Sequence, residues 1–346
     1  MLMNKRISVI IPVCNVAAWL EQCIPSVLRQ GLEESEYEII LVDFGSTDNS
    51  VEICRQYEQK ARCVRVVPEG KTSLADARNK GVLAAQGDYI CFVDADDTLA
   101  SGSLRRLIPY ADGRYDLVRY WSKLVYGKEK PLDAFEDGNV LFTEGGLAYM
   151  RRFGLETFCW CWLYKRSFLL ENDLKFYPGI YGEDFRFITD VLLKDPLVLS
   201  TSIRSYNYII RKGSLSTKRS CMNSRIWTDS ILDNFKHFSG ISETFRTTDP
   251  VLSDRFMRSL RDRVPNLFAH MLKARLPEDE FKKNVEICRD FMTLPPDPSR
   301  PEGKKMSLAL SACRFLSAHP AMYPLTSFFY RLVFVSCFKP HMNRNK

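Results

Sequence analysis

The first hundred residues alternate between two patterns of apolar positions. Continuous apolar runs rich in β-branched and aromatic residues predict strands over 7–11, 38–42, 63–67 and 89–93. Apolar residues three and four positions apart predict helices over 17–30, after the cap residues 46–48, and over 74–85. Strands that alternate with helices of this length form a mostly parallel central sheet flanked by helices, so we expect an α/β fold.

The rest of the chain is first irregular and then helical. Between residues 115 and 208 the pattern predicts strands over 117–120 and 197–200 and a helix over 185–193. After Ser216 apolar residues recur at helical spacing as far as Gly240, where we expect the helix to end. Prolines 250 and 277 predict two further helix starts. We therefore expect a main domain over 1–218, with halves 1–110 and 111–218, and a C-terminal α-helical region over 219–346.

Charge is distributed unevenly along the chain. The 346 residues carry a formal net charge of +7, and residues 219–346 hold 21 Lys and Arg against 13 Asp and Glu. Because the first 218 residues are balanced, we do not expect nucleic acid as a partner. After Glu302 basic and aromatic residues alternate without any acidic residue. That mixture suits contact with a membrane surface through 303–346, or a packed helix with a basic solvated face.

Other features of the composition indicate a cytoplasmic protein. Eleven cysteines, an odd number without a C-x-x-C pair, argue against both a disulfide framework and a zinc site. Pro12 and Asn15 interrupt the apolar run that follows Lys5 and Arg6, so a buried strand explains this run better than an export signal. No uninterrupted apolar stretch reaches the ~20 residues that span a bilayer. The basic tail at 303–346 could also attach the protein peripherally to the inner face of the membrane.

The loops after the predicted strands carry the candidate chemistry, because parallel sheets bind ligands beyond the carboxyl ends of their strands. Residues 12–15, 43–46 and 94–97 follow three of these strands. Asp94 and Asp96 form a D-x-D pair, and two carboxylates on one turn suit Mg²⁺ or Mn²⁺ shared with substrate phosphates. Asp97 followed by a threonine also suits capping of the next helix.

Several segments around these loops resemble the family 2 glycosyltransferases of the GT-A fold, a Rossmann-like architecture. They are S-V-I-I-P-V-C-N at 8–15, L-V-D-F-G-S-T-D-N-S at 41–50, A-R-N at 77–79, G-D-Y-I-C-F-V-D-A-D-D at 87–97, L-Y-K-R at 163–166, G-E-D at 182–184 and a stretch similar to Y-x-Y-x-x-R-x-x-S at 206–216. The likeness covers roughly the first 218 residues. It implies a nucleotide-sugar-binding half over 1–110 and an acceptor half over 111–218.

The resemblance implies an inverting transferase of the bacterial polysaccharide type. Such an enzyme moves a sugar from a nucleotide diphosphate, expected to be UDP, to a hydroxyl of a glycan or lipid-linked oligosaccharide. In this family Asp96 and Asp94 would hold Mg²⁺ or Mn²⁺, which neutralises charge on the leaving diphosphate. Asp184 would take the proton of the acceptor, with Glu183 in reserve. Asp184 also suits the N-cap of a helix beginning at Phe185.

The resemblance extends to the residues that would bind the donor. These candidates are Pro12, Asn15, Asp43, Arg78, Asp94, Arg211 and Ser214. By resemblance Arg78 reaches the base or ribose of the donor. The alternative is that Arg78 is a cation on the exposed surface of its helix. Arg211 and Ser214 would lie in a loop that folds over the diphosphate, or else in a solvated basic turn.

Two departures from the family pattern keep other functions open. Phe44 stands where the family usually has an aspartate that binds uracil, so the base is not fixed; Phe44 could stack on a base or fill the core. Trp162 replaces a frequent lysine, and with Trp160 it would form an aromatic wall for a sugar or pack in the core. A catalytically silent GT-A-like protein that binds a nucleotide or glycan is therefore the alternative. A nucleotidyltransferase would need a glycine- and lysine-rich phosphate loop, which 12–15 is not.

Overall fold

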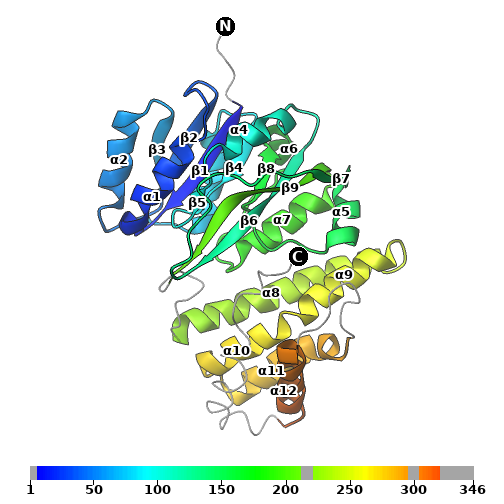
Figure 1. The fold of residues 1–346 in the computed structure, drawn as a ribbon. Helices are drawn as coiled ribbons and strands as arrows, with labels where there is room; N and C mark the ends of the chain where they lie inside the picture. The colour runs from blue at the N-terminus through cyan, green and yellow to red at the C-terminus, as the bar shows by residue number, and fades with distance from the viewer. Residues whose placement is uncertain (1–5, 212–220, 295–303, 320–346) are drawn as a thin grey trace. The chain divides into compact units, whose positions relative to one another are not determined.

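The computed structural model describes residues 6–211, 221–294 and 304–319, and these fall into two compact units (Figure 1). The first unit is an α/β unit that comprises residues 6–149, 156–179 and 183–211. The second is a helical unit that comprises residues 150–155 and 180–182 together with the described residues after 220. The predicted boundary at 218 lies outside the described residues and stays a prediction, as does the structure of Ser214 and of 320–346.

A single sheet organises the α/β unit, in the order β3-β2-β1-β4-β8-β6-β9-β5, with β7 paired to β9. The strands are β1 Ile7–Val13, β2 Tyr37–Asp43, β3 Val64–Pro68, β4 Tyr89–Phe92, β5 Thr98–Leu99, β6 Leu117–Tyr126, β7 Val140–Gly145, β8 Trp162–Lys165 and β9 Leu197–Ile210. The helices are α1 Ala17–Leu28, α2 Ser50–Lys60, α3 Leu74–Ala84, α4 Ser103–Leu107, α5 Gly146–Phe153, α6 Arg166–Glu171 and α7 Glu183–Leu193, with a short 3₁₀ turn at Ile108–Tyr110.

The first four strands are parallel and confirm the predicted α/β wind. β1 lies between β2 and β4, and all seven of its residues are buried, as expected for a strand covered on both faces. Helix α3 packs on β1 and β2. It approaches closely because Gly81 faces Ile10, whose side chain would collide with any Cβ at position 81. Beyond β4 the sheet is mixed: β8 runs antiparallel to β4 and β6, while β6 and β9 are parallel.

The helical unit contains α8 Cys221–Phe245, α9 Pro250–Arg261, α10 Val264–Ala274, α11 Glu278–Thr293 and α12 Lys304–Ala318. The predicted starts near prolines 250 and 277 are confirmed, and Asp249 caps α9 by accepting a hydrogen bond from the Leu252 amide. The predicted end at Gly240 is wrong. Helix α8 continues because Ser242 beyond it is buried and bonds to Ser253 of α9, so packing outweighs the glycine.

Residues 180–182 bring the polypeptide into the helical unit for three positions. The Tyr181 amide donates to Ser230 Oγ of α8 at 2.9 Å, and the Tyr181 ring stacks on Trp227 with centroids 5.0 Å apart. Trp227 in turn stacks on His270 of α10. Gly182 then adopts a left-handed conformation with φ of 75°, immediately before α7 begins. In the ranges that the structure describes, no helix has the length and apolar character required to cross a membrane.

Candidate active site

The loops after β1 and β2 are tied together by the side chain of Asn15. Its Oδ1 accepts hydrogen bonds from the backbone amide and the hydroxyl of Thr47 at 2.8 and 3.0 Å. The backbone amide of Asn15 donates to Ser46 Oγ. Asp43 folds back on its own turn and accepts from the Gly45 and Ser46 amides. Pro12 is buried within β1, paired with Val42. These candidates therefore shape the edge of the sheet where parallel strands present their carboxyl ends.

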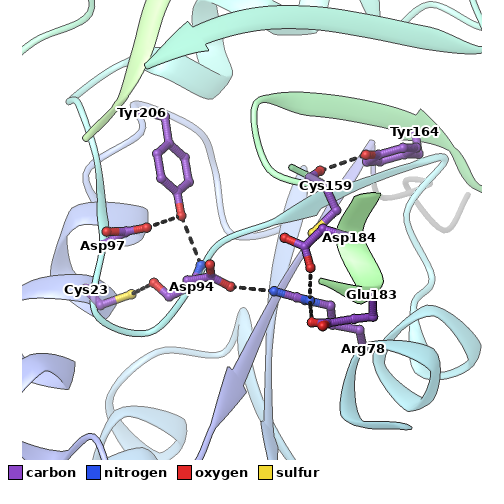
Figure 2. Close-up of polar contacts among 9 residues, drawn as sticks. All are labelled: Cys23, Arg78, Asp94, Asp97, Cys159, Tyr164, Glu183, Asp184 and Tyr206. Carbon is purple, nitrogen blue, oxygen red and sulfur yellow. Dashed lines mark hydrogen bonds and ion pairs between the residues drawn. The ribbon is translucent and has the colours of Figure 1, made fainter. Parts of the chain in front are cut away.

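A buried arginine joins three carboxylates beside these loops. Arg78 Nη2 lies 2.8 Å from Asp94 Oδ1, and its Nη1 lies 2.6 Å from Glu183 Oε1 and 2.9 Å from Asp184 Oδ1 (Figure 2). We call Arg78, Asp94, Glu183 and Asp184 the carboxylate cluster. Asp94 follows β4, Arg78 is on α3, and the acidic pair opens α7, so three elements converge here. Arg78 is 1% exposed and is not the surface cation that its sequence also allowed.

Local structure fixes the position of Arg78. Ser73 caps α3 through a capping box with Asp76, in which each side chain bonds the backbone of the other. The guanidinium carbon of Arg78 lies 5.2 Å from the centre of the Phe176 ring. The neighbouring Asn79 bonds both the amide and the carbonyl of Phe176 at 2.8 Å. The side chain is thus held by the helix that carries it and by the segment that precedes α7.

Burial, together with an excess of acid over one arginine, changes the proton affinity of Arg78, Glu183 and Asp94. Burial alone would lower the pKa of Arg78, but the charges of Asp184, Asp94 and Glu183 outweigh burial and raise it well above its ordinary value. Burial raises the pKa of Glu183 to about 8, with the Asp184 charge acting in the same direction. Burial likewise raises the pKa of Asp94 to about 6, against the opposing effect of Arg78. Glu183 is therefore the acid of the cluster whose protonated form is most favoured near neutral pH.

Asp96 lies on the other side of the D-x-D turn and pairs with a different arginine. Arg211 Nε is 2.7 Å from Asp96 Oδ2, and the Arg211 guanidinium lies over the Trp19 ring of α1 at 5.0 Å. Asp96 still interacts with Asp94, because its charge contributes to the raised pKa of that carboxyl. The structure thus brings Arg211 to the D-x-D turn, whereas Ser214 lies outside the described residues.

Asp97 does not cap a helix, so the capping role that its sequence suggested is wrong: β5 follows it, and Gly102 is the N-cap of α4. Asp97 is 1% exposed, and its Oδ2 accepts a hydrogen bond from the Tyr206 hydroxyl at 2.7 Å (Figure 2). Its Oδ1 accepts from the Ile209 amide, also at 2.7 Å. The Tyr206 hydroxyl also accepts from the Asp94 amide. The sequence did not predict that Tyr206 would hold Asp97, although Tyr206 opens the Y-x-Y stretch that the family resemblance singled out.

The two tryptophans of the expected aromatic wall are both buried. Trp162 has no exposed surface and lies beside Arg119. Trp160 is 4% exposed and stacks on Tyr206 with centroids 4.8 Å apart. Core packing therefore explains Trp162, and Trp160 supports the tyrosine that holds Asp97. Phe44 is partly exposed at the end of β2.

The D-x-D turn has the donor chemistry for a hard divalent cation. Asp94 and Asp96 each use one carboxylate oxygen for an arginine, and among the described residues neither Asp94 Oδ2 nor Asp96 Oδ1 has a hydrogen-bond partner. Two carboxylate oxygens fit Mg²⁺ or Mn²⁺, which take one or two protein carboxylates and complete their shell with water and substrate phosphates. Within the described residues no group of three or more His, Cys, Asp or Glu side chains forms a protein-only cage.

The sequence is similar to those of known glycosyltransferases. The family model for glycosyl transferase family 2 matches residues 8–171. An uncharacterised glycosyltransferase of Haemophilus influenzae is 30% identical over 235 residues, which cover 65% of this chain and 86% of that protein. The uncharacterised glycosyltransferase EpsJ of Bacillus subtilis is 33% identical over 194 residues, 54% of each chain, so the match spans about half of that relative.

A solved structure extends the similarity of fold to nearly the whole chain. Residues 1–349 of TarS from S. aureus, crystallised in complex with UDP-GlcNAc, give a TM-score of 0.64 at 19% identity. The match covers 94% of this chain and 92% of the TarS chain. At this identity the likeness shows a common GT-A fold with C-terminal helices.

Proposed function

Because the chain belongs to glycosyl transferase family 2, we propose that it transfers a sugar from a nucleotide-diphosphate donor to an acceptor hydroxyl with inversion. The donor expected is a UDP-sugar, in line with the UDP-GlcNAc complex of TarS, which shares the fold. The acceptor class is a glycan or lipid-linked oligosaccharide of a cell-surface polysaccharide. The carboxylate cluster supports the proposal most directly, since it gathers donor-side and acceptor-side acids around Arg78.

Asp184 is the proposed general base. Inversion needs a carboxylate opposite the leaving diphosphate, able to take the acceptor proton as the new bond forms. Asp184 keeps 16% of its side chain exposed, against 10% for Glu183, so it has the better access to an acceptor. Burial raises the pKa of Glu183 to about 8, which favours its protonated form near neutral pH and makes it the less available base. In this assignment Asp184 accepts the proton, and Arg78, which also pairs with Glu183, holds Asp184 in place.

Asp94 and Asp96 are the proposed donor-side residues. A divalent cation held by their two available oxygens would supply positive charge for the diphosphate that leaves. Asn15 and Asp43 keep the neighbouring loops in shape, and Arg211 contributes a guanidinium suited to phosphate oxygens. In this assignment the chain orients the donor through loops at one edge of the sheet and the acceptor through the start of α7.

Donor turnover with a matched pair of variants tests the proposal. Purified protein is screened against common nucleotide sugars by mass spectrometry, and UDP affinity is measured in parallel. Asp184→Asn should keep UDP affinity and lose transfer, while Asp173→Asn, an exposed aspartate paired only with Lys175 in the described structure, should behave as wild type. Wild-type turnover by Asp184→Asn would overturn the assignment of the base. Tight UDP binding without turnover of any donor would favour a silent binding protein.

A further inference from the structure

Arg211 is held at the D-x-D turn by two elements that are distant in sequence. It follows the last residue of β9, its Nε is 2.7 Å from Asp96 Oδ2, and its guanidinium lies over the Trp19 ring of α1. A planar guanidinium both pairs with a carboxylate and stacks on an aromatic face, so the two contacts reinforce one another. Neither side chain of the ion pair is fully exposed: Arg211 keeps 17% and Asp96 keeps 23% of its surface.

This ion pair uses the same carboxylate that would bind a metal. A guanidinium and a divalent cation are both attracted to Asp96, and a partly buried pair is screened by solvent less than a surface pair. The arginine therefore competes with the metal for negative charge. When a donor arrives, its diphosphate offers Arg211 another partner of matching geometry, because guanidinium groups bind phosphate oxygens in bidentate fashion.

The other arginine of the site is a poor candidate for such an exchange. Arg78 is 1% exposed and makes three ion pairs, so moving it would leave several buried charges without a partner. Arg211 lies at the end of a strand and retains solvent contact, so a change of partner costs less there.

We propose that Arg211 is the resident counter-ion of Asp96, that a divalent cation binds Asp96 by displacing it, and that the displaced guanidinium then binds the donor diphosphate. Trp19 acts as a positioning residue that holds the guanidinium in its resting place. This inference rests on the proposed function, because it assumes a donor site at Asp96. It goes further in assigning one side chain two successive partners and in giving Trp19 a role.

The proposal predicts that replacing Arg211 strengthens the binding of Mn²⁺ and weakens the binding of UDP. The Kd of Mn²⁺ is measured on the full chain without nucleotide, from the electron paramagnetic resonance signal of free Mn²⁺. Arg211→Ala and Arg211→Gln should bind Mn²⁺ about 10-fold more tightly than wild type. The same variants should bind UDP at saturating Mn²⁺ about 10-fold more weakly. Trp19→Ala should tighten Mn²⁺ binding by a smaller factor, and Trp19→Phe, which keeps a ring, should restore the wild-type value.

Two controls separate this inference from the proposed function. Arg204→Ala removes another arginine of β9, paired with Glu136 on the exposed side, and should leave both affinities unchanged. Asp96→Ala should abolish Mn²⁺ binding. If Asp96→Ala behaves so but both Arg211 variants bind Mn²⁺ no more tightly than wild type, the counter-ion role is overturned and the donor site stands. If Asp96→Ala binds Mn²⁺ like wild type, the metal assignment of the proposed function is itself wrong.

Discussion

The Tyr206 hydroxyl donates a hydrogen bond to Asp97 Oδ2 at 2.7 Å, although the two residues lie 109 positions apart. The same hydroxyl accepts from the Asp94 amide, and the other oxygen of Asp97 accepts from the Ile209 amide. The D-x-D turn is therefore fastened to β9, the strand that leads to Arg211. Asp97 is a structural member of the turn, which leaves Asp94 and Asp96 as the acids available to a ligand.

Replacing Tyr206 with Phe should destabilise the protein, because a buried carboxyl and a buried amide each lose a partner. We expect the free energy of unfolding to fall by about 1–3 kcal/mol in urea titrations. Tyr115→Phe is the matched control, since the Tyr115 hydroxyl makes no hydrogen bond in the described part of the chain. Equal stability of the two variants would show that the Tyr206 hydroxyl contributes nothing net.

The two acids that open α7 should respond differently to amide substitution. Glu183→Gln imitates the protonated carboxyl that burial favours, so turnover at neutral pH should stay within about threefold of wild type. Asp184→Asn removes the proposed base and should reduce turnover by about 100-fold or more, with little change in donor KM. The reverse ranking in steady-state kinetics would mean that Glu183 is the base.

Stability should decrease as pH rises through neutrality. The pKa of Glu183 is raised from 4.5 to about 8 in the folded protein, so the folded state binds more protons than the unfolded state between these values. Stability contributed by such a group is complete at low pH and is lost as pH rises from about 5 to about 8. The raised pKa of Asp94, about 6, acts in the same direction.

Carboxyls with lowered pKa values, such as Glu38 and Asp76, are ionised in both states over this range and do not oppose the trend. Melting temperatures measured across the range should therefore decline for wild type and decline less for Glu183→Gln. A Glu183→Gln profile as steep as that of wild type would contradict the assigned proton.

Two glycines in helices should respond oppositely to alanine. At Gly81 a new Cβ would collide with the Ile10 side chain of β1, so Gly81→Ala should cost about 1–3 kcal/mol through overpacking. At Gly240 in α8 nothing lies within 4 Å of a new Cβ, so Gly240→Ala should gain about 0.5–1 kcal/mol from helix propensity. Chemical denaturation of both variants checks the signs, and a stabilised Gly81→Ala would show that α3 can move away from the sheet.

The first half of the α/β unit could be predicted from sequence because its signals are local. β1 is set by a continuous apolar run and α3 by a helical segment with a capping box, and both form where the pattern placed them. The loops with Asp43, Asp94 and Asp96 follow from the same pattern. The insertion of β8 between β4 and β6 could not be predicted, since antiparallel pairing depends on contacts far apart in sequence.

The members of the site were easier to predict than their partners. Arg78 and Asp94 are 16 positions apart, but Arg78 and Asp184 are separated by 106. Only the folded chain shows that one guanidinium serves both acids. Trp19 was missed for the same reason, because an aromatic residue in the first turns of an amphipathic helix has the pattern of a packing residue. The end of α8 was mispredicted because tertiary packing outweighs a single glycine.

The anchoring of Tyr181 on Ser230 and Trp227 has an evolutionary consequence. Tyr181, Ser230 and Trp227 all belong to the helical unit, although Tyr181 and Ser230 lie 49 positions apart in the sequence. Exchange of α8 between relatives would therefore separate Tyr181 from its hydrogen-bond and stacking partners. Viable hybrids should carry residues 180–182 and α8 from the same parent.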